Sequence, residues 1–147
     1  MKAMCWLAGG VLLLAVLPVQ AEDSNLDGAK LTGTWSYVSG EKDGVKVDQE
    51  NLKKATVVIT KETLTLKGEM GDFVLKYKLD PKKTPCTIAL EITEGPAGQG
   101  SKTTGIIELK DGELRICYSP MGEKIPTEFA SKKDSGMHYF VLKRSKA

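Results

Sequence analysis

The stretch LTGTWSYV, residues 31–38, opens the part of the chain whose pattern decides the fold. Trp35 and Tyr37 fall on the same face of an extended strand, because successive side chains of a strand alternate between two faces. Gly33 stands two residues before the tryptophan, where the lack of a side chain lets another part of the chain pass close by. The stretch therefore predicts a first β-strand with one buried, aromatic face.

The same alternation continues along nearly the whole chain. Apolar side chains occupy every second position in short runs, with mostly threonine, lysine and glutamate between them, at 55–59, 64–66, 73–79, 86–92, 107–109, 114–118 and 140–142. One helix is expected, at 48–54, where Asp48 suits the N-cap and lysines follow the acidic residues, as the helix dipole favours.

Two tight turns predict the register of two hairpins. Turns at 111–112 (type I′) and at 61–62 place apolar side chains opposite one another. The expected pairs are Leu109 with Leu114, Ile107 with Ile116, Ile59 with Leu64, and Val57 with Leu66. Further strands near 32–39, 72–79, 86–93 and 138–144 bring the total to about eight in meander order, enough to close a barrel. We therefore predict an all-β, antiparallel up-and-down barrel over 31–147, with one short helix after the first strand.

The chain begins with an apolar leader. Lys2 precedes an apolar run at 6–17, and Val19 and Ala21 are small residues of the kind that signal peptidase prefers at these positions. A run of about a dozen apolar residues is shorter than the roughly 20 needed to cross a bilayer. We expect a cleaved signal peptide at 1–21, a flexible segment at 22–30, and an exported protein, periplasmic or extracellular, without stable membrane insertion.

The composition argues against a nucleic-acid partner. The formal net charge is +2, with 21 basic and 19 acidic residues, and loss of Lys2 with the signal peptide lowers the charge to about +1. Basic and acidic residues alternate without a block of one sign, and no aromatic residues are interleaved with a basic stripe. The charged side chains are therefore interpreted as a solvated surface.

Motifs for catalysis or cofactor binding are weak. GPAGQGSKT, residues 95–103, departs from a phosphate-binding P-loop, because Ser101 separates the last glycine from the lysine and a strand follows. His138 is the only histidine and begins the last strand, so it is interpreted as a surface or strand-end residue, without a second histidine for a metal site. Glu91 and Glu94 lack the apolar surroundings that a catalytic carboxyl group needs. We predict no catalytic residue, metal or cofactor, and a protein that is not an enzyme.

Cys86 and Cys117 are the cysteines that remain after cleavage of the leader. An even number in an exported protein favours a disulfide. Against this, Cys86 is two residues before the inward-facing Ile88 and so points inward as well. Cys117 directly follows the inward-facing Ile116 and so points outward. The strands that carry them are separated by another strand, or about 9–10 Å, and a bridge needs Cα atoms within roughly 7 Å. We predict that both cysteines stay reduced.

Five stretches, read together, carry a family resemblance: LTGTWSYVSGEKDGVKV (31–47), LDPKKTPCTIAL (79–90), GIIELKDGELRICYSP (105–120), PTEF (126–129) and VLKR (141–144). A Gly-x-Trp on the first strand, about eight up-and-down strands and a final arginine resemble the lipocalin superfamily. The chain is more closely similar to small exported domains typical of planctomycete bacteria, described as lipocalin-like and of unknown function. That family usually has arginine before PTEF, whereas this chain has Ile125, so any role of that arginine does not carry over. The resemblance implies that Arg144 packs across Trp35 at the closed end, and that Gly33, Trp35 and Arg144 are structural.

Two functions from different classes remain open. A binding module would hold a small hydrophobic or amphipathic ligand at the open end, away from Trp35, where the longer connections lie. Its predicted lining is Phe73, Leu90, Ile107 and Tyr118, the last offering a hydroxyl group for orientation. A protein-interaction or structural domain would instead fill its interior with its own side chains. The side chains predicted from strand alternation to point inward have enough bulk to fill a small barrel: Leu75, Leu79, Leu90, Ile92, Leu109 and Ile116.

Overall fold

The computed structural model describes residues 26–122 and 124–145. The predicted signal peptide at 1–21 lies outside these ranges. The elements within them are α1 (Gly28–Leu31), β1 (Gly33–Lys42), β2 (Val45–Lys46), α2 (Gln49–Lys53), β3 (Thr56–Ile59), β4 (Thr63–Lys67), β5 (Phe73–Asp80), β6 (Cys86–Glu94), β7 (Lys102–Lys110), β8 (Glu113–Tyr118) and β9 (His138–Arg144). None of the helices in the described part of the chain has the length and apolar character needed to cross a membrane.

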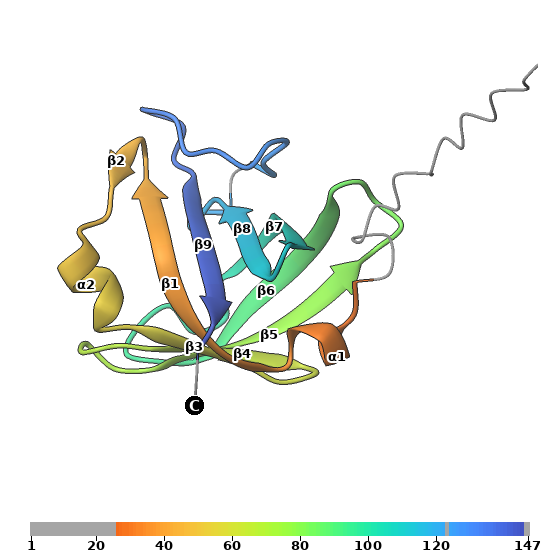
Figure 1. Ribbon diagram of the computed structural model, residues 1–147, viewed down its shortest axis with the longest axis horizontal. Helices are drawn as coiled ribbons and strands as arrows, with labels where there is room; N and C mark the ends of the chain where they lie inside the picture. Colours follow the sequence, from red (N-terminus) through yellow and green to blue (C-terminus); the bar gives the residue numbers. More distant parts are fainter. Residues whose placement is uncertain (1–25, 123, 146–147) are drawn as a thin grey trace, which may run out of the picture.

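The strands form a closed, antiparallel up-and-down barrel. β1 and β3 to β9 pair in chain order, and β9 returns to pair with β1, beside which it lies in Figure 1. β2 is an additional short strand that pairs only with the end of β1. The predicted eight-stranded barrel is confirmed, and so is the short helix after the first strand, where the Asp48 side chain caps α2 by accepting a hydrogen bond from the Glu50 amide.

Both predicted hairpin registers are confirmed. All four expected pairs are present: Leu109 with Leu114, Ile107 with Ile116, Ile59 with Leu64, and Val57 with Leu66. Asp111 and Gly112 both have positive φ angles, 53° and 78°, as a type I′ turn requires. Because the register is fixed, each strand presents one row of apolar side chains to the interior.

The two ends of the barrel differ in their connections. Short turns at 60–62, 81–85 and 111–112 lie at one end, together with α1. The long connections, at 43–55 and 119–137, lie at the opposite end. We call these the closed end and the open end. β1 runs from the closed end at Gly33 to the open end at Lys42.

The N-terminal segment, residues 22–30, was predicted to be flexible. Within the described part, from Leu26 onward, the chain packs against the closed end. Leu26 and Leu31 are almost completely buried and belong to the barrel core. Asp27 caps α1 between them by accepting a hydrogen bond from the Lys30 amide at 3.0 Å. The two leucines cover apolar surface that would otherwise be exposed at the closed end.

The two cysteines lie on opposite faces of the sheet, and no disulfide joins them. Cys86 is part of the barrel core, as predicted. Cys117 points outward but is fully buried, because the segment at 124–137, here called the strap, covers this part of the outer face. Its thiol donates a hydrogen bond to the Ala130 carbonyl at 3.4 Å, and the Phe129 ring packs near Tyr139 beside it. The prediction of an outward Cys117 was right about the face, but the side chain is not exposed.

Candidate ligand-binding cavity

At the closed end, three consecutive backbone carbonyl groups at the end of α1 accept hydrogen bonds from side chains of the barrel. The Lys30 and Thr32 carbonyls accept hydrogen bonds from the two terminal nitrogens of Arg144, at 2.6 and 2.8 Å. Between them, the Leu31 carbonyl accepts one from the Trp35 indole nitrogen at 2.8 Å. The carbonyls left unpaired at a helix end therefore find side-chain partners. The Arg144 guanidinium carbon also lies 4.5 Å from the centre of the Trp35 ring, a cation–π contact.

Gly33 makes room for this arrangement. Its φ angle is 143°, and a Cβ atom at this position would lie 2.7 Å from a terminal nitrogen of Arg144. A larger residue would push the guanidinium away from the tryptophan. Gly33, Trp35 and Arg144 thus meet in one structural cluster, the arrangement that the family resemblance implies.

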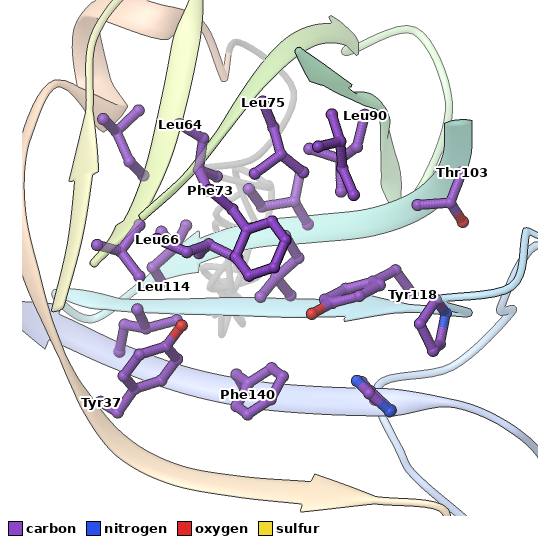
Figure 2. A pocket seen from close by; sticks show the side chains of 18 of the residues that line it. Tyr37, Leu64, Leu66, Phe73, Leu75, Leu90, Thr103, Leu114, Tyr118 and Phe140 are labelled. Atoms are coloured by element: carbon purple, nitrogen blue, oxygen red, sulfur yellow. The ribbon is translucent and has the colours of Figure 1, made fainter. Parts of the chain in front are cut away.

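Above this cluster the barrel contains a cavity of about 320 Å³ (Figure 2). Every residue of the predicted lining contributes to it: Phe73, Leu90, Ile107 and Tyr118. Trp35 is not among the lining residues, so the cavity lies toward the open end. Lys42, Lys102 and His138, at the open-end limits of their strands, complete its mouth.

The two sides of the cavity differ in composition. The side from β4, β5 and β6 is mainly aliphatic, with Leu64, Leu66, Leu75, Leu90 and Ile92, and also includes the ring of Phe73. The side from β1, β8 and β9, which lie across the barrel in the strand order, carries three aromatic rings together with Leu114, Ile116 and Leu142. Figure 2 shows Tyr37, Phe140 and Tyr118 along this second side, across the cavity from Leu64, Leu75 and Leu90. The rings of Tyr37 and Tyr118 contact Phe140, with centroids 5.3 and 6.3 Å away.

Two hydroxyl groups of this second side point into the cavity. Neither the Tyr37 nor the Tyr118 hydroxyl makes a hydrogen bond to any residue that the structure describes, and Figure 2 shows both directed toward the enclosed space. Tyr77, another inward tyrosine, instead donates its hydroxyl proton to the Thr60 carbonyl at 2.5 Å. Burial raises the pKa of Tyr118 to about 12 and also raises the pKa of Tyr37, so both are neutral hydrogen-bond donors at physiological pH.

The mouth has charges of both signs. Lys42 lines it together with His138, with which it pairs across β1 and β9, and Asp43 lies close enough to act on the charge of His138. Lys102, at the start of β7, pairs with Glu91 on β6. His138 was interpreted as a surface or strand-end residue. It does begin β9, but its ring is half-buried and lies 5.6 Å from the Tyr118 ring. Burial, assisted by the nearby Lys42 charge, lowers the pKa of His138, so the ring is neutral at physiological pH.

The sequence contained a signal for two lining residues that the prediction missed. His138 is two residues from Phe140 and Tyr37 is two residues from Trp35 on their strands. His138 and Tyr37 therefore face the interior. Ile125, which replaces the arginine usual in the resembled family, lies on the strap and is exposed. The described residues contain no cluster of three or more histidine, cysteine or acidic side chains that could hold a metal ion.

Comparisons with protein-family models, with curated proteins and with solved structures give no match. The function of the cavity must therefore be inferred from its own geometry and chemistry.

Proposed function

We propose that the mature protein is an exported, lipocalin-like barrel that binds a small hydrophobic or amphipathic molecule in its interior and is not an enzyme. The observation that carries the proposal is the cavity of about 320 Å³ inside the barrel. This volume lies within the usual range of small-molecule sites, roughly 300–1,000 Å³. Its lining is mainly apolar with a few polar groups, which is also typical of such sites.

The alternative function requires a filled interior. Four residues of the predicted inward set, Leu75, Leu90, Ile92 and Ile116, line the cavity rather than fill it. A ligand of matching shape would gain dispersion contacts with these side chains. A mainly apolar space of this size, open at one end of the barrel, therefore favours the binding module over a purely structural or protein-interaction domain.

Two tryptophan substitutions on β6 provide a test of binding inside the barrel. Ile92 lines the cavity, whereas Ala89, on the same strand, is exposed on the outer face. Ile92→Trp places an indole in the cavity, and Ala89→Trp adds the same group outside. We expect apolar probes and lipid extract from the producing organism to raise the melting temperature of the wild type and of Ala89→Trp, but not of Ile92→Trp.

Native mass spectrometry supplies an independent measurement. Protein purified from the producing organism is expected to carry extra mass that is lost on denaturation, and its N-terminus is expected at Glu22 if the leader is cleaved as predicted. The proposal is contradicted if no probe or extract raises the melting temperature of the wild type. It is equally contradicted if Ile92→Trp responds as strongly as Ala89→Trp, since binding would then occur outside the cavity.

A further inference from the structure

His138 lies where the mouth of the cavity meets the start of β9. It pairs with Lys42 on β1 and with Tyr118, a neutral phenol, on β8. Its half-buried ring lines the cavity and packs edge-on against two other lining rings, with centroid distances of 5.6 Å to Tyr118 and 6.1 Å to Phe140. It is the only histidine of the chain, and histidine is the side chain whose ordinary pKa lies nearest to neutral pH.

The surroundings of this ring disfavour a positive charge on it. Burial and the charge of Lys42 lower the pKa of His138, and Asp43 opposes them only in part. The other charged residue of the cavity lining, Lys102 on β7, pairs with Glu91 on β6. The imidazole therefore holds a proton more tightly in water than in its packed position at the mouth.

Asp43 also holds the strap beside the mouth. Its carboxylate accepts a hydrogen bond from the Gly136 amide at 2.9 Å, and its own amide donates one to the Met137 carbonyl at 3.0 Å. The next residue, Gly44, donates its amide proton to the Ser131 hydroxyl at 3.0 Å. We call these three hydrogen bonds the junction between the β1–β2 turn and the strap. Because the histidine directly follows Met137, a positive charge on its ring competes with the Gly136 amide for the Asp43 carboxylate.

We infer that protonation of His138 opens the mouth of the cavity. In mildly acidic solution the charged ring turns from Tyr118 and Phe140 toward water, and the junction beside it weakens. An open mouth with the ring in water binds the proton more tightly, so its population grows as the pH falls through the ordinary pKa of about 6.5. Bound ligand then leaves faster than at neutral pH. This inference rests on the proposed function and specifies how the same site is regulated.

The first measurement is an NMR titration of the whole mature protein without ligand, from about pH 8 to about pH 5. A single histidine gives one set of imidazole signals, and their midpoint is expected below about 6.5. Lys42→Gln should raise the midpoint and Asp43→Asn should lower it. Asparagine tolerates the positive φ angle of 52° at position 43, so the turn is kept. Lys143→Gln, at the closed end of β9, is the control and should leave the midpoint unchanged.

Amide hydrogen exchange reports the opening itself. The rates are divided by the intrinsic rates at each pH, so that only protection by the structure remains. The Gly44 and Gly136 amides belong to the junction and should lose protection as His138 titrates. The Trp35 indole N–H, which is hydrogen-bonded at the closed end, should keep its protection. In His138→Gln, whose side chain stays neutral, the two glycine amides should not respond to pH.

Ligand release is followed with decanol, which is uncharged throughout this pH range. Exchange broadening of the methyl signals of Ile107, which lines the cavity, gives the dissociation rate. The wild type is expected to release decanol about two- to fivefold faster at about pH 5 than at about pH 7.5, the range for one unfavourable charge contact near the surface. His138→Gln should release it at equal rates.

The outcomes separate the inference from the proposed function. The inference is wrong if the imidazole midpoint lies at or above about 6.5, or if the protection of Gly44 and Gly136 is independent of pH. It is also wrong if His138→Gln keeps the pH dependence of the wild type. The binding function stands after each of these results. If decanol binds at neither pH, the proposed function fails instead, and the titration and exchange data still decide whether acid opens the mouth.

Discussion

Replacing Arg144 with alanine is expected to loosen the closed end of the barrel. The guanidinium holds two carbonyl groups of the chain before β1 and covers the Trp35 ring. The substitution removes all three contacts and leaves the Lys30 and Thr32 carbonyls to solvent. The indole hydrogen bond to the Leu31 carbonyl and the burial of the Leu31 side chain then hold the end of α1.

The expected loss of stability follows from these contacts. Each hydrogen bond from the guanidinium contributes about 1 kcal/mol, at the low end for a charged donor because Arg144 is exposed. The cation–π contact adds about 0.5–1 kcal/mol at such a site. The free energy of unfolding should fall by about 2–3 kcal/mol, and for a domain of this size the melting temperature should fall by about 8–12 °C.

The assay combines thermal unfolding with tryptophan fluorescence. Trp35 is completely buried, so its emission should move to longer wavelength in Arg144→Ala as water gains access. Arg144→Lys keeps the charge but not the planar fork, and is expected to recover less than half of the loss. Lys143→Ala, the neighbouring exposed position, is the control. If Arg144→Ala leaves both the melting temperature and the emission unchanged, the proposed role of this cluster is refuted.

Three further predictions concern other parts of the molecule. Ser131→Ala should lower the free energy of unfolding, measured by chemical denaturation, by about 1–3 kcal/mol. The reason is that the buried hydroxyl accepts a hydrogen bond from the Gly44 amide and donates one to the Met137 carbonyl. An unchanged denaturation midpoint would show that these hydrogen bonds contribute nothing. Burial raises the pKa of Tyr118 to about 12, above the value of about 10 in the unfolded chain, so its contribution to stability is complete below pH 10 and is lost as the pH rises toward 12. Tyr118→Phe should therefore lose less stability over this pH range than the wild type, and equal losses would contradict the burial of this phenol. Cys86 and Cys117 should react with a thiol reagent only after unfolding, whereas lack of reaction in non-reducing denaturant would reveal a disulfide.

The barrel could be predicted because its signals are local. A period of two identifies the buried face of each strand, and a tight turn such as Asp111-Gly112 fixes which residues face one another. Closure followed from the number of strands and from the position of Arg144 on the last one. Each of these steps except closure depends only on residues that are near one another in the sequence. Closure also requires contact between the first and last strands.

The strap and the packed N-terminal segment could not be predicted in the same way. Parity places Cys117 on the outer face but says nothing about what covers that face. The strap has no regular periodicity, so its position over Cys117 depends on particular contacts such as that of Ala130. Leu26 likewise lies in a short segment, and its packing at the closed end depends on the shape of the folded barrel.

The cavity was only partly predictable. Parity identified Phe73 and Leu90 as facing inward, and the long connections identified the open end. Whether inward side chains fill a barrel or leave a space depends on the barrel diameter and on side-chain conformations, which no local pattern contains. The residues at the mouth were missed for a related reason, since Lys42 and His138 come from strands far apart in sequence that pair at the open end.

The most direct test of the central claim is methyl NMR of the wild-type protein during titration with decanol. Ile106 and Ile107 are adjacent on β7 and equally buried, but Ile107 lines the cavity and Ile106 lies on the outer face. Binding inside the barrel predicts that the Ile107 methyl signals shift and saturate while those of Ile106 stay nearly constant. Equal shifts at both residues, or no shift at Ile107 up to the solubility limit of decanol, would contradict ligand binding in the cavity.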